Sequence, residues 1–85
     1  NRYISSGEIN SKVSDTAQAT DLVRKSYESD NVVIDELDGL TVNGDTWWFN
    51  LRPSNTEPLL RLNVEAATQA QMESVRDAVL SLIRG

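Results

Sequence analysis

Two segments in which apolar and polar residues alternate constrain the fold of this chain more than any other feature. They span residues 46–51 and 59–65. A period of two places every second side chain on the same face of a strand, so each segment has one apolar face. The residues on these faces are Trp47, Phe49, Leu51, Leu60, Leu62 and Val64. The pattern predicts antiparallel strands that bury one side of a sheet.

Helices are expected on either side of this central region. Asp15 with Gln18, and Thr68 with Gln71, have the spacing of helix N-caps and capping boxes. Apolar residues follow each cap at helical spacing, which predicts amphipathic helices over about 16–28 and from residue 69 to a stop at Gly85. The apolar stripes are most simply core-facing: Ala19, Leu22, Val23 and Tyr27 in the first helix, and Met72, Val75, Val79, Leu82 and Ile83 in the second.

Further strands are expected over 7–13, 31–37 and 40–42, with turns at Asp38-Gly39 and at 43–45. The order strand, helix, four strands, helix predicts an α+β fold of two layers, a mainly antiparallel sheet with both helices on one face. The other face has no cover within the chain. It would carry Trp48, which is then either half-exposed or in contact with another domain, together with Asn50, Arg61, Asn63 and Glu65.

The composition excludes several kinds of site. Eighty-five residues predict one domain, over 1–85. The chain has no Cys and no His, so disulfides, thiolate metal sites and a histidine base are excluded. A net charge of −5 with scattered basic residues argues against nucleic acid as a partner, and no apolar run is long enough for a membrane span. A cytoplasmic location is expected, and the start at Asn1 suggests a fragment or a processed product.

The polar loop over 52–58 is the strongest candidate for a binding site. Arg52 can form two parallel bonds to an anion, Ser54 and Thr56 each add a hydroxyl, and Asn55 adds an amide. Backbone N–H groups at 54–57 are further candidate donors, and Asn55 tolerates a positive φ that would turn the loop inward. Two prolines restrict the loop, and phosphate is the anion that fits this set of donors best.

The residues alone leave another interpretation of this loop open. Ser, Asn, Thr and Pro are also common in turns whose side chains satisfy their own backbone. Glu57 would repel an anion unless it points away. Three or four bonds of about 1.5–3 kcal/mol roughly equal the ~4–15 kcal/mol lost on immobilising a ligand, so free phosphate would bind in the millimolar range or more weakly. Such a loop would orient a substrate that is held elsewhere.

The loop closely resembles the phosphate-binding loop of the α-D-phosphohexomutases, whose C-terminal domain carries Arg-x-Ser-(Gly or Asn)-Thr-Glu-Pro. Residues 59–66 resemble the next strand of that domain, and 7–10 resemble its start. The order of elements matches its TATA-binding-protein-like fold. Asn55, where phosphoglucosamine mutases tend to have Gly, points to the phosphomannomutase/phosphoglucomutase branch.

This resemblance implies a role within a four-domain enzyme that converts a hexose 1-phosphate, of mannose or glucose, to the 6-phosphate. Arg52, Ser54, Asn55 and Thr56 would hold the phosphate that is not reacting. A phosphoserine in the first domain and Mg²⁺ in the second would carry the chemistry. The loop that would carry the phosphoserine and the loop that would bind Mg²⁺ do not occur in this sequence. No catalytic residue or cofactor is therefore expected here, and the isolated chain should be inactive. The domain is also expected to rotate when the active site closes.

Two further hypotheses come from the sequence. The uncovered sheet face around Trp48 could make the chain a free-standing protein-interaction module, with no role in sugar chemistry. The acidic residues Asp35, Glu36 and Asp38 could hold a metal, although such a group is more often a solvated hairpin end.

Overall fold

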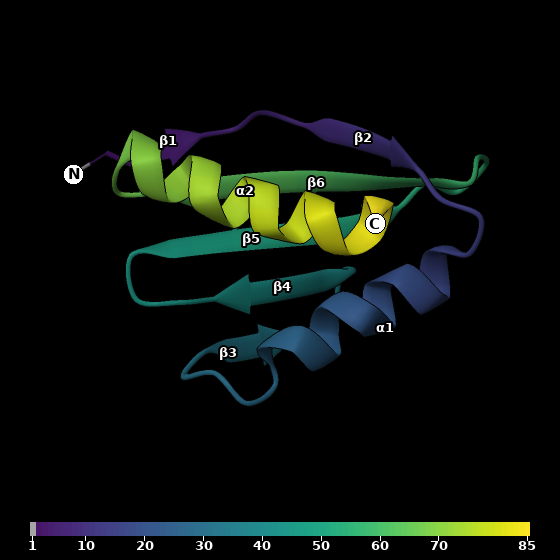
Figure 1. Cartoon of the computed structure of the whole chain (residues 1–85), viewed down its shortest axis with the longest axis horizontal. Helices are drawn as coiled ribbons and strands as arrows, with labels where there is room; N and C mark the ends of the chain where they lie inside the picture. Colours follow the sequence, from purple (N-terminus) through teal and green to yellow (C-terminus); the bar gives the residue numbers. More distant parts are fainter. Residues whose placement is uncertain (1) are drawn as a thin grey trace.

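A six-stranded antiparallel sheet, covered on one face by two helices, makes up the protein in a computed structural model that describes residues 2–85 (Figure 1). The predicted α+β fold with two layers is confirmed. The elements, in chain order, are β1 (Ile4–Ser5), β2 (Ile9–Lys12), α1 (Thr16–Tyr27), β3 (Val33–Asp35), β4 (Leu40–Asn43), β5 (Trp47–Pro53), β6 (Leu59–Ala66) and α2 (Gln69–Arg84).

The four strands β3 to β6 form a meander, and β1 and β2 both pair with the outer edge of β6. The alternation in the sequence sets the faces of this sheet as predicted. Phe49 lies opposite Val64, and Leu51 opposite Leu62, and all four side chains are fully buried beneath the helices. Because the side-chain period is two, this register sends the intervening polar residues to the uncovered face.

The sheet begins with two short strands where one was predicted over 7–13. Between β1 and β2 the chain has one more residue than the facing part of β6, which makes a bulge. Gly7 provides the positive φ of 71° at this point, and the Ser6 N–H donates to the Val64 carbonyl at 2.8 Å. The extra residue lets Ile4 and Ile9 both face the core although their numbers differ by five.

The strand predicted over 31–37 is also shorter, because both of its ends make turns. The Val32 N–H donates to the Asp30 carbonyl at 2.9 Å, and the Leu37 N–H donates to an Asp35 carboxylate oxygen at 2.8 Å. These bonds take the backbone groups that a longer ladder would use, so pairing with β4 is confined to Val33–Asp35.

Both helices begin at the residues that the capping patterns predicted. The Asp15 side chain accepts the Gln18 N–H at 3.0 Å, and the Thr68 hydroxyl accepts the Gln71 N–H at 3.1 Å. The closing helix ends at Gly85, whose N–H donates to the Ser81 carbonyl at 3.0 Å. Among residues 2–85, no helix has the length and apolar character needed to cross a lipid bilayer.

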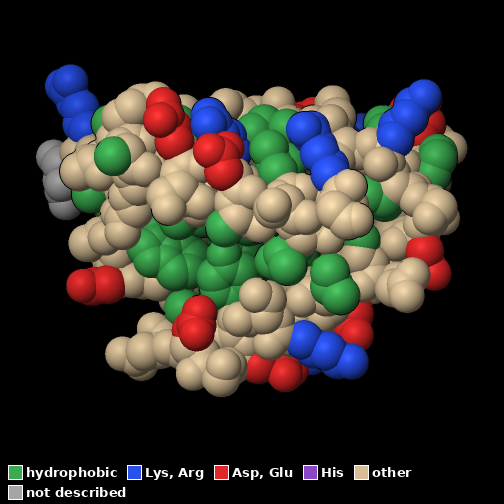
Figure 2. Space-filling model, in the orientation of Figure 1, with side chains coloured by type: hydrophobic (Ala, Val, Ile, Leu, Met, Phe, Trp, Pro, Cys, Tyr) green, Lys and Arg blue, Asp and Glu red, His purple; other side chains and the backbone are tan. Residues whose placement is uncertain are grey.

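The core lies between the helices and the covered face of the sheet. An aromatic cluster closes one part of it: Tyr27 meets Phe49 edge-on at 5.3 Å between ring centroids, and Trp47 stacks on Phe49 at 6.2 Å. On the helical side, hydrophobic side chains remain visible along the seam between α1 and α2 (Figure 2). Leu22 is the most exposed large apolar residue of α1, at 48%.

The opposite face of the sheet is polar and carries no helix (Figure 1). Trp48 lies half-buried on this face, where it was predicted, and its indole N–H donates to a Glu65 carboxylate oxygen at 3.2 Å. Asn50 donates to the Thr41 hydroxyl on the neighbouring strand at 3.0 Å. Cross-strand polar contacts therefore satisfy much of this face without a second layer.

Candidate functional site

The polar loop predicted as a binding site joins β5 to β6, the two longest strands of the sheet. At its base Pro53 lies opposite Leu60, and the Ser54 N–H donates to the Leu59 carbonyl at 2.9 Å. The carbonyl of Pro58 accepts the Val13 N–H at 3.0 Å, which fastens the loop to the segment before α1. Both ends of the loop are therefore fixed by backbone bonds, as an orienting site requires.

The four residues predicted to bind an anion line one cavity of about 490 Å³, which we call the loop cavity. Pro53 and three residues from outside the loop complete its wall. The full lining is Asp38, Gly39, Arg52, Pro53, Ser54, Asn55, Thr56 and Arg61. The structure thus brings the turn between β3 and β4 and the start of β6 to the same place as the loop.

Arg61 is the functional candidate that sequence reasoning missed. It lies directly opposite Arg52 in the β5–β6 pairing, on the uncovered face. Like charges directly opposite each other on a sheet are unfavourable unless an anion lies nearby. Arg52 Nη1 is 3.0 Å from Asp38 Oδ2, and within residues 2–85 no carboxylate lies within 4.0 Å of the Arg61 side chain. One carboxylate thus faces two guanidinium groups, and the cavity keeps an excess positive charge although the chain is acidic.

The backbone donors of the loop are fewer than the sequence suggested. The Ser54 N–H is already used by Leu59, and the Thr56 N–H reaches the Ser54 hydroxyl at 3.4 Å, which is a weak contact. For the described residues 2–85, the amides of Asn55 and Glu57 have no hydrogen-bond partner. The loop therefore offers two free backbone donors, and a third that a ligand can readily take over.

Asn55 does not adopt the positive φ that it could tolerate. Among the described residues, only glycines have a positive φ, so the loop turns without a left-handed residue. The short turn bonds at Ser54 and at Leu59, whose N–H donates to the Glu57 carbonyl at 2.7 Å, make the reversal instead. The Asn55 side chain, with no hydrogen bond to any residue within 2–85, keeps its donors for other partners.

Glu57 does not line the loop cavity. Its exposed side chain borders a separate small hollow with Lys12, Pro58 and Leu59. Glu57 therefore borders a different hollow from the one that the two arginines line, which weakens the objection that its charge raised.

The three acidic residues near the β3–β4 turn have separate roles in the structure. Asp35 accepts a backbone N–H, Glu36 lies 3.9 Å from Arg24, and Asp38 pairs with Arg52. Across residues 2–85, no group of three or more acidic, His or Cys side chains is arranged to hold a metal ion.

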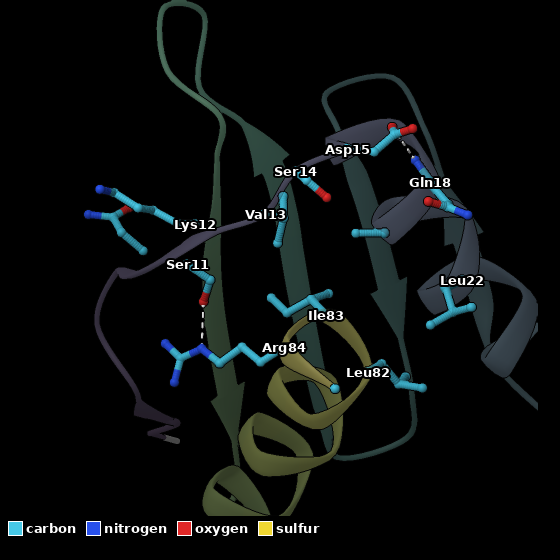
Figure 3. A pocket seen from close by; sticks show the side chains of 13 residues that line it. Ser11, Lys12, Val13, Ser14, Asp15, Gln18, Leu22, Leu82, Ile83 and Arg84 are labelled. Carbon is cyan, nitrogen blue, oxygen red and sulfur yellow. Dashed lines mark hydrogen bonds between the residues drawn. The ribbon is translucent and has the colours of Figure 1, made fainter.

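A larger hollow of about 740 Å³ lies between β2, the start of α1 and the end of α2; we call it the helix groove (Figure 3). Two of its polar side chains are already engaged: Arg84 Nε donates to the buried Ser11 hydroxyl at 3.0 Å, and Asp15 caps α1 through Gln18. Leu22 and Leu82 lie at its helical side (Figure 3). The smaller loop cavity is the better candidate for an anion site, because the four residues predicted to bind an anion line it and two arginines lie opposite each other there.

Comparison with known proteins shows to which family the chain belongs. The family model of the phosphoglucomutase/phosphomannomutase C-terminal domain matches residues 8–82. The chain belongs to this family. The match extends from the bulge before β2 to the last turn of α2, so it includes the whole loop cavity.

Individual members of the phosphoglucomutase/phosphomannomutase family are similar to this domain. A phosphomannomutase of Methanocaldococcus jannaschii is 40% identical over 82 residues, covering 96% of this chain and 18% of its own length. The phosphohexose mutase of Xanthomonas campestris is 44% identical over 85 residues, covering 99% and 19%. The chain thus spans less than a fifth of the length of these relatives.

A crystal structure agrees with the fold. A phosphoglucomutase/phosphomannomutase family protein from Burkholderia thailandensis matches 99% of this chain and 18% of its own, with a TM-score of 0.72 at 23% identity. At that identity the likeness supports the arrangement of helices and strands and carries no further argument.

Proposed function

We propose that this domain binds the non-reacting phosphate group of a hexose phosphate within a phosphomannomutase/phosphoglucomutase. The single observation that carries this proposal is the convergence of Arg52, Arg61 and the side chains of Ser54, Asn55 and Thr56 on one cavity with excess positive charge. Phosphate supplies the opposing charge and accepts the parallel N–H bonds of a guanidinium group.

The available binding energy indicates whether the loop cavity captures free phosphate or orients a substrate that is held elsewhere. Bonds to a charged group contribute about 1.5–3 kcal/mol each, against ~4–15 kcal/mol lost on association. The domain alone therefore binds inorganic phosphate weakly, in the millimolar range. Within an enzyme that holds the sugar elsewhere, the same contacts orient the substrate for phosphoryl transfer between its 1- and 6-positions.

The rest of the enzyme supplies the chemistry in this proposal. The relatives are more than five times as long as this chain, which we take as the C-terminal member of four domains. We assign the phosphoserine and the Mg²⁺ implied by the family to the other domains. The partners are a mannose or glucose phosphate and those domains, and the isolated chain does not catalyse. A cytoplasmic setting belongs to the same proposal.

Titration of the isolated chain with inorganic phosphate, followed by amide NMR, tests the anion site. Shifts that saturate at millimolar phosphate and concentrate at residues 52–56, Arg61 and the 38–39 turn are expected, since these groups line the cavity. Chloride at the same ionic strength is the control. No shifts at high millimolar phosphate, or shifts centred on Trp48, would refute the assignment and favour the interaction module.

Activity of the full-length enzyme tests the assigned orienting role. Arg52→Ala is expected to depress kcat/KM for a hexose phosphate strongly, mainly through KM and misorientation of the substrate. Arg76→Ala removes the same charge from α2, where Arg76 pairs with Asp77, and serves as the matched control. Wild-type activity in the Arg52 variant would show that the loop has another role.

The uncovered sheet face provides little support for a free-standing interaction module. Trp48, the residue that suggested it, is half-buried and its N–H is already bonded to Glu65. The neighbouring positions on β5 and β6 carry polar side chains, so the face lacks the apolar centre that protein interfaces usually have.

A further inference from the structure

The turn between β3 and β4 is built against the side chain of Arg52. Gly39 has a φ of 70°, and a Cβ atom at this position would lie 2.6 Å from Arg52 Cγ and 2.7 Å from the Leu51 carbonyl oxygen. Only glycine can take both this conformation and this close approach without strain. The turn and the arginine stem therefore fit together closely.

The same turn is also fastened to the sheet. Asn50 Nδ2 donates to the Asp38 carbonyl at 2.9 Å and to the Thr41 hydroxyl at 3.0 Å. Asn50 lies on β5 two residues before Arg52, on the same face. The backbone of Asp38 thus has a fixed position relative to the strand that carries the arginine.

The Asp38 carboxylate then contacts the guanidinium group itself. Asp38 Oδ2 is 3.0 Å from Arg52 Nη1, and this is the one ion pair that Arg52 forms with residues 2–85. One of five N–H donors is used, and Nε and Nη2 have no partner within the described chain. A phosphate can therefore bind through those nitrogens while Asp38 holds Nη1.

We propose that Asp38 is a positioning residue that fixes the Arg52 guanidinium group for phosphate binding. This inference rests on the proposed function of the loop cavity. The side chain of Arg52 is 44% exposed, so without a partner its end would sample several rotamers. Asp38 removes that freedom before the ligand arrives, which lowers the entropy lost on binding.

Electrostatics alone predict the opposite effect of this residue. A carboxylate beside the site repels phosphate, so its removal would tighten binding if charge dominated. The side chain of Asp38 is 80% exposed, and water screens that repulsion well. Arg61, which lacks a carboxylate partner within residues 2–85, supplies the net attraction. We therefore expect orientation to outweigh repulsion.

The test compares Asp38→Ala and Asp38→Asn with Glu36→Gln in the isolated chain. Glu36 lies in the same turn and faces Arg24, so its substitution removes one negative charge without touching Arg52. Two quantities are measured by NMR: the dissociation constant of inorganic phosphate, and the rate of rotation about the Nε–Cζ bond of Arg52 without phosphate. Because Asp38 is exposed, its substitution should not unfold the chain, so a change in phosphate affinity reports on the site itself.

Asp38→Ala is expected to weaken phosphate binding about two- to fivefold and to speed the Arg52 rotation. Asp38→Asn, which keeps an acceptor oxygen, should lie between the alanine variant and the wild type. Glu36→Gln should leave the rotation unchanged and leave binding equal or slightly tighter. Equal or tighter binding in Asp38→Ala would overturn the positioning role.

The same measurements distinguish failure of the proposed phosphate site from failure of the positioning role of Asp38. If the wild type binds no phosphate while Asp38→Ala still speeds the Arg52 rotation, the loop cavity is not a phosphate site, although Asp38 does hold the arginine. If phosphate binds but the Arg52 rotation is the same in both proteins, Asp38 does not position Arg52 and the further inference is wrong.

Discussion

The helix groove and the loop cavity differ in the side chains that line them as well as in size. The helix groove is the larger, at about 740 Å³ against 490 Å³ for the loop cavity. In the helix groove Arg84 is bonded to Ser11, and apolar side chains line the helical side. In the loop cavity two arginines lie opposite each other, and Arg52 alone pairs with a carboxylate, that of Asp38. Although the helix groove is larger, we expect an anion to bind in the loop cavity, because two guanidinium groups lie opposite each other there.

The largest expected effect is a loss of stability, caused by a substitution in the lining of the helix groove. Ile83→Ala removes a side chain that is only 9% exposed and is expected to lower the free energy of unfolding by about 2–4 kcal/mol. Urea denaturation measures this. Phosphate affinity of the protein that remains folded should be unchanged, and a matching loss of affinity would mean that the two hollows are coupled.

Arg52→Ala should weaken phosphate binding and leave stability almost unchanged. Loss of the guanidinium bonds is expected to weaken phosphate binding by about 1.5–3 kcal/mol, roughly ten- to a hundredfold, in an NMR titration. Stability should change by less than about 1 kcal/mol, because the pair with Asp38 is exposed. Arg52→Lys, which keeps the charge without the planar fork, should recover only part of the affinity. Full recovery would show that charge alone is enough.

Ser54→Ala tests the hydroxyl donors with a smaller expected effect. The variant loses one bond to the ligand, and it also loses the oxygen that the Thr56 N–H approaches at 3.4 Å. Phosphate binding should weaken roughly tenfold by the same titration, since a single bond from a neutral hydroxyl to a charged ligand contributes about 1.5 kcal/mol net, the low end for such bonds. Ser81→Ala, on α2, is the control and should bind as the wild type does.

The smallest effect concerns the core and appears only at alkaline pH. Burial, and to a lesser extent Asp30, raise the pKa of Tyr27 above 10.0. The unfolded chain therefore loses this proton at a lower pH than the folded one, so stability is full below pH 10.0 and declines as pH rises through the folded pKa. Tyr27→Phe should flatten this decline in urea denaturation, whereas Tyr3→Phe, at an exposed position, should not.

Much of the fold could be predicted because it depends on local patterns. The alternation over 59–65 and the caps at Asp15 and Thr68 each act within a few residues, and the structure confirms all three. The short first strand, Ile4–Ser5, was missed because two residues carry no period, and its pairing with β6 depends on a bulge at Gly7.

The candidate site was predictable in part. The composition of the loop identified Arg52, Ser54, Asn55 and Thr56, and the structure places all four on one cavity. Donor availability could not be predicted, since the use of the Ser54 N–H by Leu59 depends on the exact hairpin. For the same reason the sequence could not show whether Asn55 uses the positive φ that it tolerates, and in the structure it does not.

The sequence by itself determined the two layers, the polar face of the sheet and the presence of a donor-rich loop, because periodicity, capping and turn chemistry are local properties. Only the tertiary structure brought Arg61 opposite Arg52 and paired Asp38 with Arg52. Strand register and the packing of one turn on another strand depend on contacts between residues far apart in the chain. The charge balance of the loop cavity therefore emerged only on folding.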